Sequence, residues 1–188
     1  MSGLGNPGSE YEGTRHNVGY EVVDRVAREA GIAVKRLECR ALTGRGRIGG
    51  EPVVLARPVT YMNASGEAIA GLLTKLKLGP DALLVVSDEI DLPLGTLRMK
   101  PRGSSAGQKG LKSVEACLGT REFARLRIGI RGERYSRERE LGDYVLDRFS
   151  KSERAAIDEA LDRAAEAVRT WVTDGIAAAM NRFNALSE

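Results

Sequence analysis

One histidine and a few carboxylates carry most of the chemistry that this sequence of 188 residues could perform. His16 stands in the segment 14–19 (TRHNVG), between a glycine-rich turn and a stretch with helical spacing. A histidine at such a junction can act as a general base, because its pKa lies close to neutral pH. It can equally cap the helix or hold a structural hydrogen bond, and the residue type alone leaves both interpretations open.

Asp88 is the carboxylate best placed to work with His16. It lies in the acidic cluster 87–91 (SDEID), directly after the apolar run 82–86 (ALLVV), a pattern typical of a buried strand that ends at a site. A carboxylate there can hold one imidazole nitrogen protonated and leave the other free to accept a proton. On spacing alone, a simple strand-end or turn carboxylate is the competing interpretation.

Asn6 and Asn63 lie in two further loops. Asn6 belongs to the turn 3–8 (GLGNPG), whose glycines let the backbone and the side-chain amide approach a ligand closely. This turn is not a dinucleotide fingerprint, because Pro7 interrupts it and its spacing differs from GxGxxG. Asn63 stands in 57–66 (RPVTYMNASG) at an expected strand-to-helix junction, where a helix N-cap is the simpler interpretation.

The nucleophiles and metal ligands of common hydrolases are missing from the sequence. It contains no GxSxG elbow, and neither Cys39 nor Cys117 stands in a catalytic motif. The single histidine excludes a His-rich metal site, so we predict no metal and no cofactor. A hydrolase built from these residues would activate water with a general base. Two distant cysteines also indicate a reducing compartment.

Basic residues gather around a segment rich in glycine and serine, 101–110, although the whole chain carries a net charge of only 29 − 26 = +3. Alternate positions on a strand share one face, where they could contact phosphates or form a solvated surface balanced by glutamates. An aromatic content of 5% argues against a platform that stacks single-stranded bases. The basic residues concerned are Arg98, Lys100, Arg102, Lys109, Lys112, Arg125, Arg127 and Arg131.

Hydrophobic periodicity predicts one α/β domain with helices on both faces of a mixed sheet, since 188 residues without a linker fit a single core. We expect 101–110 to be a mobile loop. No apolar run is long enough for a membrane span and no signal peptide is recognisable, so we predict a cytoplasmic protein. Helices are expected over 18–30, 63–78 and 111–118 and from about 150, and strands over 35–39, 41–48, 52–57, 82–86, 97–100 and 126–130.

Taken together, the ordered motifs resemble the bacterial-type peptidyl-tRNA hydrolase family over nearly the whole chain. The resemblance implies a single-domain, three-layer α/β/α fold across 1–188 and hydrolysis of the ester between a peptide and the terminal ribose of tRNA. It also implies recycling of prematurely released peptidyl-tRNA, bound through its acceptor stem and 5′ phosphate, and we expect a monomer. The motifs are GLGNPG, TRHNVG, RPVTYMNASG, SDEIDLP, GLKS from Gly110 and AMNRFN at 179–184.

The resemblance assigns roles by position. It implies that His16 is the catalytic base, that Asp88 orients it, and that Asn6 is a hydrogen-bonding residue of the catalytic site. By the same match, substrate-binding positions are Tyr11, Asn63 and Met62, and tRNA-binding positions are Arg98 and Arg127, with Lys100 beside them.

Two departures from the family pattern bear on these roles. Where the family carries Gly-His-Asn-Gly before a helix, this chain has GQKG at 107–110. Lys109 can donate a hydrogen bond but cannot accept one, and its charge could bring the loop to tRNA phosphates, which makes it a tRNA-binding candidate. Only Met1 and Ser2 precede GLGNPG, where the family has a longer apolar strand. Either the first strand is shortened or the N-terminus is altered or misassigned, and the sequence leaves open how firmly Asn6 is held.

Two alternative functions remain at this point. A non-catalytic RNA-binding relative of the same fold, such as the plant-organelle branch recruited to intron splicing, would bind RNA without turnover. Retention of His16, Asp88, Asn6 and Asn63 argues against it. An enzyme acting on a small ester or nucleotide would show little salt dependence, whereas phosphate contacts predict tRNA affinity that falls steeply with salt.

Overall fold

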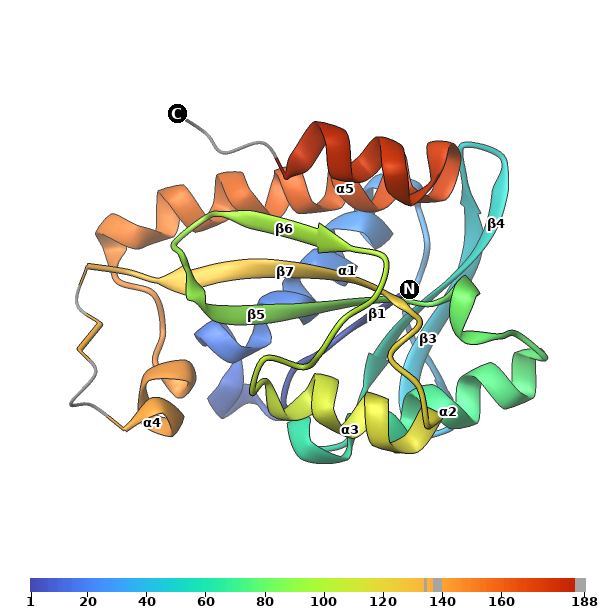
Figure 1. The fold of residues 1–188 in the computed structure, drawn as a ribbon, viewed down its shortest axis with the longest axis horizontal. Helices are drawn as coiled ribbons and strands as arrows, with labels where there is room; N and C mark the ends of the chain where they lie inside the picture. The colour runs from blue at the N-terminus through green and yellow to red at the C-terminus, as the bar shows by residue number, and fades with distance from the viewer. Residues whose placement is uncertain (134, 137–139, 185–188) are drawn as a thin grey trace.

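Seven strands form one mixed sheet in the computed structural model, which describes residues 1–133, 135–136 and 140–184 (Figure 1). The strand order is β2-β3-β4-β1-β5-β7-β6. The four central strands are parallel, and antiparallel pairs complete both edges. The strands are β1 (Ser2–Gly3), β2 (Arg36–Glu38), β3 (Ala41–Ile48), β4 (Glu51–Pro58), β5 (Leu84–Pro93), β6 (Leu97–Lys100) and β7 (Ala124–Arg131).

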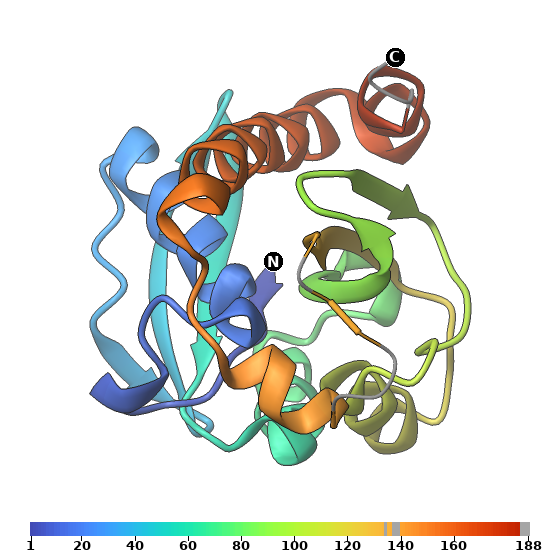
Figure 2. The same ribbon diagram turned by 90° about the vertical axis from the view of Figure 1, so that its left-hand side faces the viewer.

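Helices cover both faces of this sheet. α1 (Val18–Ala30) and α5 (Lys151–Phe183) pack on one face, and α2 (Ser65–Leu76) and α3 (Lys109–Leu118) pack on the other (Figure 2). The short helix α4 (Leu141–Leu146) lies beside the 3-10 turn Arg15–Asn17. The predicted three-layer α/β/α fold with a mixed sheet is therefore confirmed.

Both faces of the central strands are buried, which explains the continuous apolar run in β5. Leu84 and Val86 belong to the core under α1 and α5, whereas Val85 between them belongs to the core under α2 and α3. Side chains alternate between the faces of a strand, so a strand segment that contributes to the cores on both sides is apolar at consecutive positions. No helix in the described part of the chain is long and apolar enough to cross a membrane.

Close packing between α1 and β1 sets the position of the turn that carries His16. A Cβ atom on Gly3 would lie 2.0 Å from the carbonyl oxygen of Gly19, and a Cβ on Gly19 would lie 2.5 Å from the backbone nitrogen of Leu4. Only glycine permits this approach of helix and strand backbones. The N-terminal end of α1 is thereby held directly against the sheet.

Several predicted boundaries differ from the structure. β5 continues past Val86 to Pro93, because its residues pair with β7 through the acidic cluster up to an irregularity between Glu89 and Pro93. The helix expected over 63–78 begins as the 3-10 turn Met62–Ala64, and the N-cap of α2 is Ala64. The alternative role of Asn63 as an N-cap is therefore wrong.

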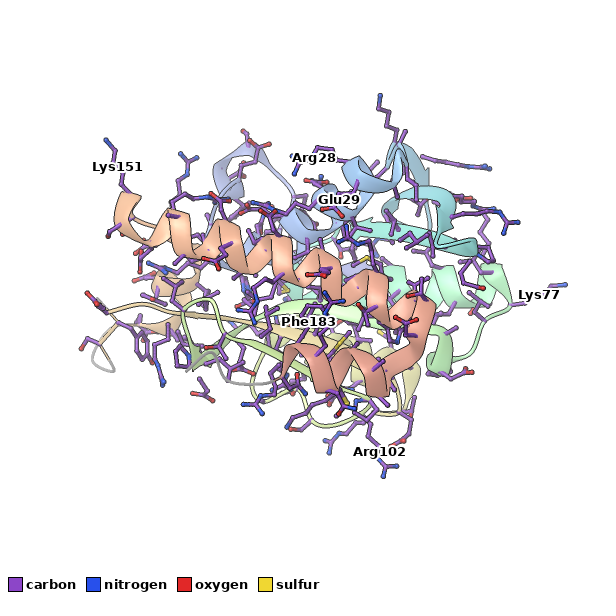
Figure 3. All side chains as sticks on the ribbon, turned by 90° about the horizontal axis from the view of Figure 1, so that it is seen from above. Arg28, Glu29, Lys77, Arg102, Lys151 and Phe183 are labelled. Carbon is purple, nitrogen blue, oxygen red and sulfur yellow. The ribbon has the colours of Figure 1, made fainter. Side chains whose placement is uncertain are left out.

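The C-terminal helix begins where the sequence predicts it. Ser150 caps α5 through a reciprocal pair of hydrogen bonds with Glu153. The helix crosses the molecule from Lys151, bends at Gly175 and turns back, which brings Phe183 over the middle of the molecule (Figure 3). Gly175 has a φ of 86°, a conformation that favours glycine.

An apolar cavity of about 540 Å³ lies at the start of β1, between the first residues of β4 and β5. Ser2 pairs with Ala56 and Val85, so the first residues of β4 extend beyond the N-terminal start of β1 and have no β1 residue beside them. The amino group of Met1 donates to the carbonyl of Val54 at 2.8 Å, and burial lowers its pKa from 8.0 to about 6. The cavity lining includes Met1, Val54, Leu72, Leu73, Leu83 and Trp171.

We predict that a longer β1 stabilises the protein. Inserting Leu-Val between Met1 and Ser2 would fill the cavity and move the buried amino group outward, with a gain of about 1.5–3 kcal/mol for each fully buried side chain. Because the folded-state pKa of that amine is lowered, the unfolded wild type binds more protons between pH 6 and 8, and its free energy of unfolding rises with pH across this window.

Urea unfolding at pH 6 and pH 8 checks this prediction. The Leu-Val variant should be more stable than wild type at both pH values, with the larger gain at pH 6. A Ser-Gly insertion at the same point serves as the control, because it relocates the amine without filling the cavity. Equal stability of the Leu-Val and Ser-Gly variants would contradict the cavity argument.

Candidate active site

His16 and Asp88 form a buried hydrogen-bonded pair beyond the carboxyl end of β1, beside the middle of β5. Nδ1 of His16 lies 2.9 Å from Oδ2 of Asp88, and the two residues are 7% and 4% exposed. His16 comes from the 3-10 turn Arg15–Asn17 after β1, and Asp88 from β5, which is the direct neighbour of β1. With Nδ1 donating to the carboxylate, Nε2 is the nitrogen that can accept a proton.

The environment of His16 moves its pKa in opposing directions. Burial lowers the pKa of His16, but the charge of Asp88 and the hydrogen bond to it outweigh burial and raise the pKa above its ordinary value of 6.5. The positive charge of Lys109 acts in the same direction as burial. His16 is therefore neutral, and able to act as a base, only above this raised pKa.

Asn6 is held by three hydrogen bonds. Its backbone N–H donates to Oδ1 of Asn17 at 2.8 Å, and Nδ2 of Asn17 donates to its carbonyl at 3.0 Å. Its side-chain Oδ1 accepts from the backbone N–H of Met62 at 2.8 Å, which leaves Nδ2 as the group that can donate to a substrate. Contacts with Asn17 and Met62 therefore hold Asn6 firmly, although β1 spans only Ser2–Gly3.

The other predicted substrate-binding residues lie on turns around this pair. Met62 is buried, and Asn63 beside it is exposed, both on the turn after β4. Tyr11 is half-buried on the 3-10 turn Ser9–Tyr11, and its carbonyl accepts from the hydroxyl of Thr14 at 2.8 Å. The structure thus links Met62 and Tyr11 to the segments that carry Asn6 and His16, and it leaves Asn63 open to solvent.

A buried ion pair anchors the turn of His16 from behind. Nη2 of Arg15 lies 2.8 Å from Oε2 of Glu153, and its Nη1 donates to the carbonyl of Ile130 at 3.1 Å. The guanidinium also stacks over the ring of Tyr144, 4.4 Å from its centroid. Burial raises the pKa of Glu153, but hydrogen bonds from Arg15 and Ser150 lower it by more. The turn is thereby tied to α5, β7 and α4 together.

Arg127, a predicted tRNA-binding residue, is buried at the base of the segment 101–108. Its guanidinium is buried, with Nη1 2.7 Å from Oε2 of Glu89 and Nη2 donating to the carbonyl of Ser104. Alternation along β7 predicts which face a side chain occupies but not that the segment 101–108 covers this face. Arg125 makes the same kind of contact, to the carbonyls of Gly103 and Ser104. Both arginines hold the loop through these contacts, and a contact of Arg127 with tRNA stays a prediction.

The remaining basic candidates are accessible. Arg98 is half-buried on β6 directly opposite Arg127, and Lys100 is exposed at the end of the same strand. Lys109 is exposed at the first position of α3. Within the described residues, no three side chains of His, Cys, Asp or Glu lie close enough together to hold a metal ion.

Comparisons with known proteins identify the family to which this arrangement belongs. A family model described as "Peptidyl-tRNA hydrolase" matches residues 1–188. The chain belongs to the peptidyl-tRNA hydrolase family. The peptidyl-tRNA hydrolase of Brevibacillus brevis is 47% identical over 186 residues, which cover 99% of this chain and 97% of that relative.

Solved structures of the peptidyl-tRNA hydrolase family show the same fold. The crystal structure of the peptidyl-tRNA hydrolase of Acinetobacter baumannii matches with a TM-score of 0.91 and 38% identity, covering 98% of this chain and 93% of that one. The relative from Koribacter versatilis is 47% identical over 97% of this chain and 90% of its own length. Family membership therefore rests on sequence and structure together.

Sequence reasoning missed two residues of the site. Asn17 follows His16 directly in the motif but was passed over, although its side chain holds Asn6. Gln108 stands beside Lys109 in a departure from the family pattern, and its amide reaches Asp88 at 2.9 Å. The signal for Gln108 was its place in GQKG, where the family carries Gly-His-Asn-Gly, because the exchange of histidine for glutamine changes the chemistry of the residue beside Lys109.

We predict that Asp88→Asn slows hydrolysis of peptidyl-tRNA by about 10²–10⁴-fold, because a neutral partner no longer stabilises the imidazolium or fixes its tautomer. The acid limb of the pH–kcat/KM profile should also move to lower pH, since the carboxylate that raises the pKa of His16 is gone. Initial rates of peptidyl-tRNA hydrolysis, measured in quenched reactions between pH 5 and 9, report both effects. An unchanged acid limb would contradict the assigned pair.

Proposed function

We propose that the protein hydrolyses the ester that links the C-terminal carbonyl of a peptide to the terminal ribose of tRNA, and so recycles prematurely released peptidyl-tRNA. The observation that carries this proposal is the 2.9 Å contact between Nδ1 of His16 and Oδ2 of Asp88, in a chain that belongs to the peptidyl-tRNA hydrolase family. This contact supports a base whose free Nε2 can act on water.

The proposed reaction follows from these groups. Neutral His16 takes a proton from water at Nε2 while the water oxygen attacks the ester carbonyl, and Asp88 stabilises the imidazolium that forms. The tetrahedral intermediate then collapses, and the imidazolium returns the proton to the departing ribose oxygen. Nδ2 of Asn6, whose Oδ1 is already engaged by Met62, donates to the substrate carbonyl as negative charge develops on it.

We propose that the basic residues near this site hold the tRNA backbone. Arg98, Lys100 and Lys109 lie on β6 and at the start of α3 and are at least partly exposed. Contacts from them to the 5′ phosphate and the acceptor stem would carry no base sequence, which suits use of many different tRNAs. Arg127 would act indirectly by holding the carbonyl of Ser104.

We further propose a monomer that works in the cytoplasm. Every group in the proposed reaction comes from one chain, so a second copy is not needed to complete the site. Cys39 and Cys117 are both free, which suits a reducing compartment.

We predict that His16→Ala abolishes turnover of a defined N-blocked aminoacyl-tRNA while tRNA binding survives. Removing the imidazole takes away the base but none of the exposed basic groups. Release of the blocked amino acid and filter binding of uncharged tRNA measure the two properties on the same preparations. Hydrolysis by the His16→Ala variant near the wild-type rate would overturn the proposed mechanism, and wild-type binding without any turnover would favour the RNA-binding alternative.

We predict two effects for Lys109→Asn. KM for peptidyl-tRNA should rise and become less sensitive to salt, because one phosphate contact is lost. The acid limb of the pH profile should move upward, because the positive charge that lowers the pKa of His16 is removed. Lys77→Asn is a matched control: Lys77 is exposed at the C-cap of α2, the opposite end of that helix from the turn Met62–Ala64, and its positive φ of 56° suits Asn. Figure 3 shows Lys77 pointing away from the molecule. If Lys109→Asn matches the control in both properties, Lys109 has neither role.

A further inference from the structure

Gln108 uses both ends of its side-chain amide inside the protein. It is the N-cap of α3 and only 9% exposed. Its Oε1 accepts from the backbone N–H of Leu111 at 2.7 Å, and its Nε2 donates to Oδ1 of Asp88 at 2.9 Å. Nε2 also lies 3.3 Å from the sulfur of Met62. One side chain therefore joins the start of a helix to the carboxylate beside His16.

The two oxygens of Asp88 are divided between two partners. Oδ1 accepts from Gln108 and Oδ2 faces His16. A carboxylate with a hydrogen bond at each oxygen cannot rotate without breaking one of them. The contact with Gln108 therefore fixes the orientation of the Asp88 carboxylate. In this orientation Oδ2 of Asp88 faces Nδ1 of His16.

The orientation of the Gln108 amide is itself determined by the helix. The N–H of Leu111 is one of the unpaired donors at the start of α3, and it requires an acceptor. Oε1 must face this N–H, so Nε2 must face Asp88. The amide has no charge at any working pH, so the donor to Asp88 is permanent, whereas an imidazole at this position would titrate.

Packing leaves Gln108 little room to move. A Cβ atom on Gly110 would lie 2.5 Å from the sulfur of Met62, 2.7 Å from Cδ1 of Leu4 and 3.0 Å from Oε1 of Gln108. The first turn of α3 is thus pressed against Leu4 and against Met62, whose backbone N–H holds Asn6. Lys109, the next residue, points outward and is exposed.

We infer that Gln108 is a positioning residue for the hydrolysis proposed above: its amide locks the Asp88 carboxylate, and through it the His16 ring, to the N-terminus of α3. The inference rests on the proposed function for its effect on rate. The charges that act on His16 in this arrangement are those of Asp88 and Lys109.

Three variants separate positioning from simple capping. Gln108→Ser keeps a short side chain that can cap Leu111 but cannot reach Asp88. Gln108→Glu keeps the capping acceptor and the length, but it presents a carboxylate oxygen to Oδ1 of Asp88. Gln108→Leu removes both contacts at similar size and reports the cost of losing the cap as a lower Tm.

We expect Gln108→Ser and Gln108→Glu to melt above Gln108→Leu, because each keeps an acceptor for the N–H of Leu111, and to lose about 10- to 100-fold in kcat, the usual loss for outer hydrogen-bond partners of a site. KM should stay within about twofold of wild type, because no substrate contact is changed. In Gln108→Glu the acid limb of the kcat profile should also move to higher pH, because a second negative charge near His16 favours the imidazolium.

Kinetics on N-blocked aminoacyl-tRNA from pH 5 to 9, with Tm measured on the same samples, test the inference. Wild-type kcat and an unshifted acid limb in both Gln108→Ser and Gln108→Glu would overturn it, while wild-type turnover in the same assay would leave the proposed function intact. If wild type does not turn over, the proposed function fails. An NMR titration of His16 then still decides the inference, because a pKa that is higher in Gln108→Glu than in wild type supports it, and an unchanged one overturns it.

Discussion

The hydrogen bond between His16 and Asp88 is the contact on which the site depends, and much of the fold serves to make it possible. The two residues are 72 positions apart in the chain and meet because β1 and β5 are parallel neighbours. β1 ends at Gly3, and the chain that follows turns back over the middle of β5, where Asp88 lies. The close approach of Gly3 and Gly19 brings α1 down onto the sheet, so that the turn before it lies above Asp88.

The polar side chains around this contact are held by other polar groups and not by apolar packing alone. Arg15 and Glu153 tie the turn to α5, Asn17 ties it to Asn6, and Gln108 ties Asp88 to α3. A buried polar group that loses its partner keeps its desolvation cost, at about 1–3 kcal/mol. Each connection therefore rigidifies the site strongly, and a change at one member is felt by its neighbours.

Periodicity and motif order predicted the three layers, most elements and the residues of the central pair. These features depend on local spacing, since apolar alternation marks strands such as β7. The burial of Arg127 was not predictable in this way, because it depends on a loop from elsewhere in the chain that covers β7. The extension of β5 through its acidic cluster depends likewise on pairing with a strand that follows much later.

The anchoring of Asn6 also depends on contacts that sequence patterns do not predict. The few residues before GLGNPG left the anchoring of Asn6 open, and Asn17 and Met62 hold it through hydrogen bonds that no spacing rule reveals. Gln108 was visible as an unusual residue, but its role requires the distance to Asp88. Sequence patterns thus indicated which segments form the site, and long-range geometry decided what individual polar side chains do there.

The central claim is that Asp88 holds His16 with its proton on Nδ1 and with a raised pKa. The chain has a single histidine, so an NMR titration of protein labelled with 15N-histidine reports this ring without ambiguity. We expect a pKa above 6.5 and, at high pH, a neutral ring protonated at Nδ1 with Nε2 as the free base. A pKa at or below 6.5, or a neutral ring protonated at Nε2, would contradict the account.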